Sequence, residues 1–186
     1  MVLPKTTALA AVLLATLAGS AKGLEFSDAY ERNGTAMRLS GSGFLHFGPL
    51  LKGAEAAFYL GDGVAPGESL EDVPRRIEIE YLWSIPAEVF ASVTLKQIRR
   101  NVDTPTLDRI LPAIQRLGRL YADVEPGDCY SLTYFPGVGT ELALNGRAVG
   151  LIEGKEFSMA VFSIWIGNRP VDAKLRQKLL SRPRPL

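Results

Sequence analysis

Between Gly127 and Gly167 the chain reads GDCYSLTYFPGVGTELALNGRAVGLIEGKEFSMAVFSIWIG, which predicts three strands followed by a buried helix. Residues 129–135 alternate in polarity, as is typical of a strand with one face in a core. Asn145-Gly146 favours a type I′ turn, because both residues tolerate a positive φ. The turn separates a strand at 141–144 from a return strand at 149–152, so the two should form a hairpin.

The segment from Phe157 to Ile166 is apolar on nearly every side, with only Ser158 and Ser163 as polar residues. A helix of this kind has no face suited to water and must pack against a sheet or other helices. Gly167 is predicted to end the helix in the left-handed C′ conformation.

The rest of the chain adds further strands and helices. Strands are expected at 37–47, 50–60 and 76–83. In the first of them, Gly41 and Gly43 indicate a bulge or a close approach by another part of the backbone. In the third, charged residues alternate with apolar ones, which predicts one face in the core and the other in solvent.

Helices are expected from Pro86 to about Arg100, from 104 to about 117, and from 170 to Leu180. Thr104 is predicted to cap the second helix, with Pro105 at its first position. The order is sheet, two helices, more sheet and two more helices. This order predicts an α+β fold rather than an alternating α/β fold.

Residues 1–23 have the layout of a secretory signal peptide: Lys5, an apolar run from Ala8 to Ala18, and small residues after it. Cleavage is expected after Ala21, with Gly23 as the second choice. The alternative is an uncleaved membrane anchor, but an apolar run of about 11 residues is short against the roughly 20 that a span needs. The prediction is therefore a periplasmic or secreted protein with one domain, residues 24–186, and no membrane span in the mature chain.

Composition excludes several classes of function. The chain has 21 basic and 20 acidic residues, and such a balance argues against a nucleic-acid surface. Cys129 is the only cysteine and His46 the only histidine, so a zinc site and a Cys–His nucleophile both lack parts. Three loop acids, Asp123, Glu125 and Asp128, could hold a cation or be solvated. No cofactor and no metal are predicted.

The pattern GD.Y.L.Y.PG.GT.L.LNG, followed by G.I.G..F..A.F.IW.G..P, resembles the chalcone isomerase-like family, in particular its bacterial secreted branch. The resemblance implies an antiparallel sheet with helices packed on one face and a ligand cleft between them. Function is a separate question, because one fold hosts many functions.

The enzymes of that family carry an early-strand arginine, a threonine before a G-V-Y-L-like strand, a helical tyrosine and asparagine, and a late hydroxyl. Arg38 could be the arginine. The threonine position falls near Ala54, and the late hydroxyl position at Ile164. Ser163 is one residue away, which is about 100° of helix rotation. The resemblance therefore predicts no catalytic residues, and if the chain were an enzyme it would be an intramolecular lyase.

Non-catalytic relatives in the superfamily bind fatty acids through an arginine and a tyrosine. By resemblance, the predicted ligand-binding residues are Arg38, Tyr59, Arg99 and Tyr134, with Arg100 as a further candidate. The alternative is that the arginines are solvated and the tyrosines are core aromatics. Three functions stay open: binding of a small apolar or acyl ligand, a scaffold that only binds a protein partner, and a lyase.

Overall fold

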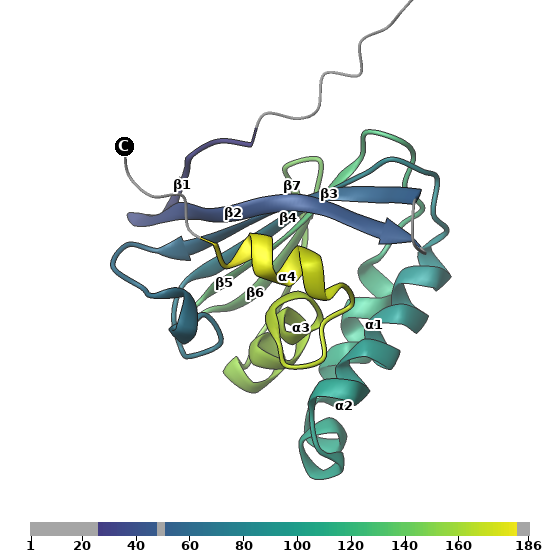
Figure 1. Ribbon diagram of the computed structural model, residues 1–186. Helices are drawn as coiled ribbons and strands as arrows, with labels where there is room; N and C mark the ends of the chain where they lie inside the picture. Colours follow the sequence, from purple (N-terminus) through teal and green to yellow (C-terminus); the bar gives the residue numbers. More distant parts are fainter. Residues whose placement is uncertain (1–25, 48–50, 182–186) are drawn as a thin grey trace, which may run out of the picture.

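The computed structural model describes residues 26–47 and 51–181, so the predicted signal peptide, residues 1–23, lies outside the described residues. The elements, drawn in Figure 1, are β1 (Ala29–Arg32), β2 (Thr35–Phe47), β3 (Leu51–Gly61), the 3₁₀ turn η1 (Pro66–Glu68), β4 (Arg75–Tyr81), α1 (Ala87–Asn101), α2 (Thr104–Leu120), β5 (Cys129–Phe135), β6 (Gly139–Leu144), β7 (Arg147–Ile152), α3 (Lys155–Ile166) and α4 (Ala173–Leu179). Within the described ranges, no helix has the length and apolar character that crossing a membrane requires.

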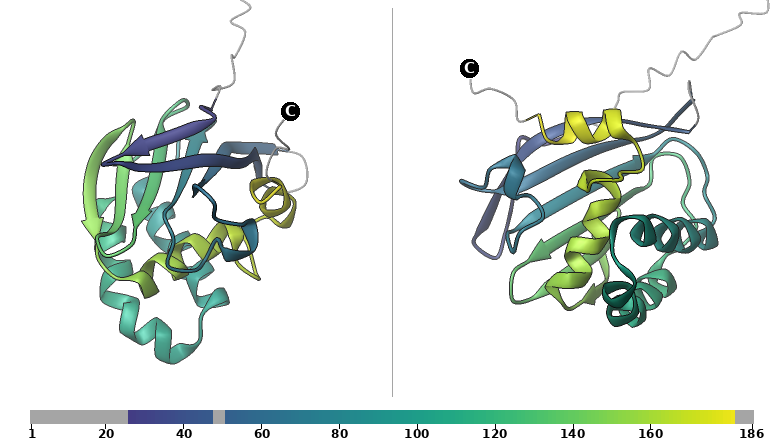
Figure 2. Two further views of the ribbon diagram at one scale, coloured as in Figure 1. Left: turned by 90° about the vertical axis from the view of Figure 1, so that its left-hand side faces the viewer. Right: turned by 60° about the horizontal axis from the view of Figure 1, so that its bottom comes forward.

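The strands form one antiparallel sheet in which every strand pairs with its neighbours in sequence, in the order β1 to β7. The helices cover one face of this curled sheet (Figure 2). Helix α4 packs on β2 and β3, α3 packs on β6, and α2 packs on β7. The predicted α+β fold, antiparallel with helices on one face, is confirmed.

The stretch 127–167 folds as its sequence indicates, into β5, β6, β7 and α3. Asn145 and Gly146 have φ values of 51° and 76°, as a type I′ turn requires. The prediction for Gly167 is wrong, because its φ is −75°. A Cβ there would lie 2.6 Å from the Ser163 carbonyl oxygen and 2.8 Å from Asn101 Oδ1, so close packing, not a left-handed turn, explains this glycine.

The glycines of β2 mark a close approach, as predicted. A Cβ on Gly41 would lie 1.9 Å from the carbonyl oxygen of Lys178 in α4. A Cβ on Gly43 would lie 2.7 Å from Cδ of the same lysine. The chain also has a register shift between Leu39 and Gly41. The missing side chains therefore let α4 lie directly on β2.

The cap of α2 is Asp103, not Thr104. The Asp103 carboxylate accepts a hydrogen bond from the backbone N–H of Thr106 at 2.9 Å, and Thr104 is already helical. Both residue types are good caps, so the sequence alone could not decide between neighbouring positions.

The far face of β4 is not simply solvated, contrary to the sequence prediction. A second, smaller core lies on that face, made of Met37, Ala57 and Tyr59 with Tyr30 packed against it. Strand β1 reaches over this face: the Tyr30 ring lies 4.1 Å from the Arg76 guanidinium, and Arg32 pairs with Glu141 of β6. Because the sheet curls, side chains on both of its faces become buried.

Candidate functional site

An apolar cavity of about 140 Å³ lies between the sheet and the helices. Its floor is a row of cross-strand neighbours, Ile77, Leu132 and Leu142, from β4, β5 and β6. Its other walls come from α1 and α3, with Phe90, Val93 and Ile164. Alternation along the strands puts the floor residues on the helix-facing side, so the cavity follows from the same periodicity that builds the core.

One end of the cavity is walled by aromatic rings. Tyr81, Phe90, Tyr121 and Tyr130 pack with ring centroids 5.1 to 6.2 Å apart, mostly edge to face. The Tyr130 hydroxyl accepts a hydrogen bond from the Ala122 N–H at 2.7 Å and donates one to the Ala122 carbonyl at 3.2 Å. These contacts fix the wall in place.

Few polar atoms face this space. The hydroxyls of Thr94 and Tyr121 share a hydrogen bond of 3.1 Å. The Tyr81 hydroxyl has no hydrogen-bond partner in the part of the chain that the structure describes. Burial raises the pKa of Tyr121 to about 12 and raises that of Tyr81 as well, so both are neutral hydroxyls at physiological pH. Since the described lining includes no Lys, Arg, His, Asp or Glu, the cavity suits an uncharged group.

The cavity opens to solvent along α1. Val89 and Val93 line it and are each 41% exposed. Leu45 of β2 and Val171 of the α3–α4 connection, both half-buried, also line the cavity. We call this opening, bounded by Val89, Val93, Leu45 and Val171, the mouth.

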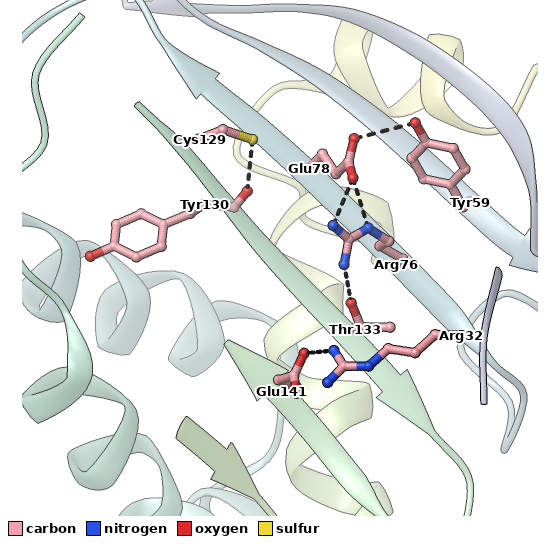
Figure 3. A network of polar contacts seen from close by, with 8 residues as sticks. All are labelled: Arg32, Tyr59, Arg76, Glu78, Cys129, Tyr130, Thr133 and Glu141. Atoms are coloured by element: carbon pink, nitrogen blue, oxygen red, sulfur yellow. Dashed lines mark hydrogen bonds and ion pairs between the residues drawn. The ribbon is translucent and has the colours of Figure 1, made fainter. Parts of the chain in front are cut away.

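The structure places Arg38 and Tyr59 away from the cavity. Arg38 has a side chain that is 68% exposed and pairs with Asp62 at 2.6 Å. Tyr59 lies on the opposite face of the sheet, where its hydroxyl donates to Glu78 at 3.3 Å (Figure 3). Burial, and then the nearby charge of Glu78, raise the pKa of Tyr59. Tyr59 therefore belongs to the polar network of Figure 3, not to the space between the sheet and the helices.

That network is built around Arg76. Its guanidinium donates to Glu78 at 2.7 and 2.8 Å and to the Thr133 hydroxyl. Cys129 lies nearby on the same face, half-buried, and burial raises the pKa of its thiol to about 11. Arg76 and Glu78, the two charged residues of this network, pair with each other, so we interpret the network as structural.

The other two predicted residues also lie outside the cavity. Arg99 is exposed on α1. Tyr134 faces the helices, one row beyond the cavity floor, and its hydroxyl donates to Asp72 at 2.6 Å. The four predicted ligand-binding residues are thus spread over both sheet faces and α1, and none of them lines the cavity.

The sequence interpretation missed Arg75, which is 0% exposed. Its guanidinium donates to the carbonyls of Ser69 at 3.1 Å and Glu71 at 2.5 Å, and to the Ser158 hydroxyl of α3 at 2.7 Å. It also lies 4.7 Å from the Tyr134 ring centroid. Burial lowers the pKa of Arg75 to about 10, so it stays charged. The alternation of β4 could have indicated the burial of Arg75, because Arg75 lies on the same strand face as the apolar residues 77 and 79.

The residues at the expected catalytic positions carry no hydroxyl toward the cavity. Ala54 is fully buried in β3. Ile164 lines the cavity, while the neighbouring Ser163 hydroxyl donates to the Ala160 carbonyl within α3 at 2.6 Å. The arrangement gives the cavity alkyl walls at the point where a late hydroxyl would stand.

The remaining chemistry-bearing residues have structural partners. His46 Nδ1 lies 3.6 Å from Asp172, which caps α4. Asp123 accepts from the Ala87 N–H at the start of α1, and Asp128 accepts from the Glu125 N–H. Among the described residues, no group of three or more potential metal ligands comes together.

Comparison with known proteins gives a family and a fold. A fatty-acid binding protein from Arabidopsis thaliana has a similar structure, with a TM-score of 0.65 and 14% sequence identity, covering 84% of this chain and 91% of that chain. At this identity the likeness concerns the fold. No curated protein matches the sequence. The profile of the chalcone isomerase-like family matches residues 18–181, nearly the whole chain, and the protein belongs to that family.

Proposed function

We propose that this protein binds a small apolar or acyl ligand in the cavity between its sheet and α1, without converting it. The observation that carries the proposal is an open cavity with apolar walls and only neutral hydroxyls. Its volume of about 140 Å³ is close to that of an engineered cavity of about 150 Å³ that takes up benzene. About six carbon atoms can therefore enter without rearrangement of the walls. The similar fold of a protein named as a fatty-acid binding protein supports an acyl chain as the ligand.

A binding role is favoured over a lyase. Closing a ring through a phenolate and an enolate calls for a cation and well-placed donors at the reacting atoms. No cation lines the cavity in the described residues, and the nearest hydroxyl pair, Thr94 and Tyr121, is already engaged with itself. The open cavity also favours a ligand over a scaffold that only binds a protein partner. Binding a partner at the surface does not require an apolar cavity between the sheet and the helices.

The expected site of action is the periplasm or the outside of the cell. This part of the proposal rests on the signal-peptide pattern of residues 1–23. N-terminal sequencing of the protein exported from a Gram-negative host tests it. A chain that begins after Ala21 or after Gly23 supports export with cleavage, and an intact Met1 contradicts a cleaved signal peptide.

The cavity can be tested with 1-octanol, an uncharged ligand, because the protein carries its own reporter. Trp165 lines the cavity, and Trp83, the only other tryptophan, is 49% exposed and can be replaced by phenylalanine. We expect 1-octanol to change Trp165 fluorescence and to release heat in calorimetry. Leu132→Phe, which adds a ring to the floor, should weaken binding by about tenfold or more, because the ring occupies the ligand's space.

Val138→Phe is the matched control, since Val138 is 55% exposed in the β5–β6 turn and is not among the residues that line the cavity. It should bind 1-octanol like the parent protein. Absence of binding by the parent, or equal binding by Leu132→Phe, contradicts the proposal.

A further inference from the structure

The protein contains two Asn-Gly turns with the same backbone conformation. Asn33-Gly34 joins β1 to β2, and Asn145-Gly146 joins β6 to β7, in each case as a two-residue loop between paired strand ends. Asn33 and Gly34 have φ values of 53° and 73°, close to the 51° and 76° of Asn145 and Gly146. All four residues are exposed. The two turns therefore form a matched pair within one protein.

The two asparagine side chains differ in what holds them. Asn145 Nδ2 donates a hydrogen bond to Asp128 Oδ1 at 2.8 Å, and Asn145 Oδ1 accepts one from the Cys129 N–H at 2.8 Å. In the part of the chain that the structure describes, the Asn33 side chain makes no hydrogen bond. The turn type explains why both positions are Asn-Gly, but it does not explain this difference.

An asparagine that precedes a glycine can lose its side-chain amide to its own backbone. The glycine backbone nitrogen attacks Cγ of the asparagine, a new N–Cγ bond replaces the Cγ–Nδ2 bond, and the proton lost by that nitrogen leaves with ammonia. Water then opens the resulting succinimide ring and gives aspartate or isoaspartate. Glycine favours the attack because no Cβ shields its nitrogen. The reaction needs only water, and it requires an asparagine side chain that is free to turn toward the backbone.

We propose that Asn33 is a site of this spontaneous modification, and that the hydrogen bonds to Asp128 and Cys129 protect Asn145. The inference is independent of ligand binding. Before Asn145 can react, two side-chain hydrogen bonds must break, one of them to a charged carboxylate. In the folded protein, Asn33 should therefore react at least about tenfold faster than Asn145.

The modification should act on β1. Isoaspartate adds a methylene to the main chain of the turn, and the length of a hairpin loop sets the register of its strands. Among the described strands, β1 pairs with β2 alone. It carries Tyr30, which packs against the second core, and Arg32, which pairs with Glu141 (Figure 3). Modification of Asn33 should thus loosen the cover that β1 gives to this face of the sheet.

Peptide mass spectrometry of the folded protein, incubated in isotope-labelled water, measures both sites at once. Each reacted asparagine carries an oxygen atom from the water in place of its amide nitrogen. We expect the label to appear at residue 33 at least about tenfold faster than at residue 145. In urea, where the chain is unfolded and both side chains are free, the two rates should become similar. Equal rates in the folded protein, or a difference that persists in urea, overturn the proposal.

Asp128→Ala tests the protection directly, because it removes the acceptor of Asn145 Nδ2. It should speed the reaction at Asn145 by about fivefold and leave the rate at Asn33, the internal control, unchanged. No acceleration at Asn145 refutes protection by this hydrogen bond.

The modified protein can be separated by ion exchange through its added negative charge. Its amide hydrogen exchange should rise in β1 and stay unchanged in β7, because only the first hairpin is altered. Unchanged exchange in β1 contradicts the loosening of that strand.

Discussion

Replacing Arg75 by alanine is expected to lower the free energy of unfolding by about 3 kcal/mol, which corresponds to a fall in Tm of about 9 °C for a domain of this size. The substitution removes a side chain with no exposed surface and three hydrogen bonds. It leaves the Ser69 carbonyl and the Ser158 hydroxyl without the Arg75 donor, while the Glu71 carbonyl keeps the hydrogen bond from the Val73 N–H. These contacts join the η1 loop to α3, so both elements should loosen together. Urea unfolding followed by far-ultraviolet circular dichroism measures the loss.

Arg38→Ala is the control for removing an arginine. Its side chain is 68% exposed and makes one ion pair, so its loss should lower the free energy of unfolding by no more than about 1 kcal/mol.

Arg75→Met separates the effect of lost side-chain volume from the effect of lost charge. A buried cation without an acidic partner is costly, and methionine restores volume without that cost. Arg75→Met should therefore be more stable than Arg75→Ala, and parent-like stability of Arg75→Ala would refute this role for the guanidinium.

Gly41→Ala is expected to destabilise the protein by about 3 kcal/mol, at the upper end of overpacking effects. The added Cβ would lie 1.9 Å from the Lys178 carbonyl oxygen and 2.9 Å from its carbonyl carbon. Both atoms belong to the backbone, so a rotamer change cannot relieve the clash and α4 must move off β2. Urea unfolding should show the loss, and amide hydrogen exchange should rise first in α4.

Gly67→Ala is the matched control, because a Cβ there would meet no atom within 4 Å. It should be neutral or stabilising by up to about 1 kcal/mol, through the reduced entropy of the unfolded chain. If Gly41→Ala unfolds at the same urea concentration as Gly67→Ala, the contact between β2 and α4 is not as close as described here.

Much of the fold could be predicted from local signals. Asn145-Gly146 determines a hairpin almost by itself, and the apolar run of α3 can only be buried. The close approach at Gly41 was also predictable, because a glycine inside a strand usually has a packing reason. Gly167 was misread because a glycine after a helix serves either a positive φ or close packing, and the sequence does not distinguish them.

The residues that line the cavity were harder to predict, because the curl of the sheet is not a local property. Tyr59 is 1% exposed and has the burial of a core residue, yet it lies in the second core on the far face. Alternation tells which residues share a face but not which face the helices cover. Nor can a sequence reveal an open cavity, since unfilled space depends on how all of the surrounding side chains pack.

The most direct test of ligand binding at this cavity is a crystal of the protein soaked with 8-bromooctanoate, with the anomalous signal of bromine used to locate the tail. We expect one dominant bromine peak inside the cavity, within contact distance of Ile77, Leu132 and Ile164. A bromine peak only on the outer surface, or in another hollow, would contradict the account.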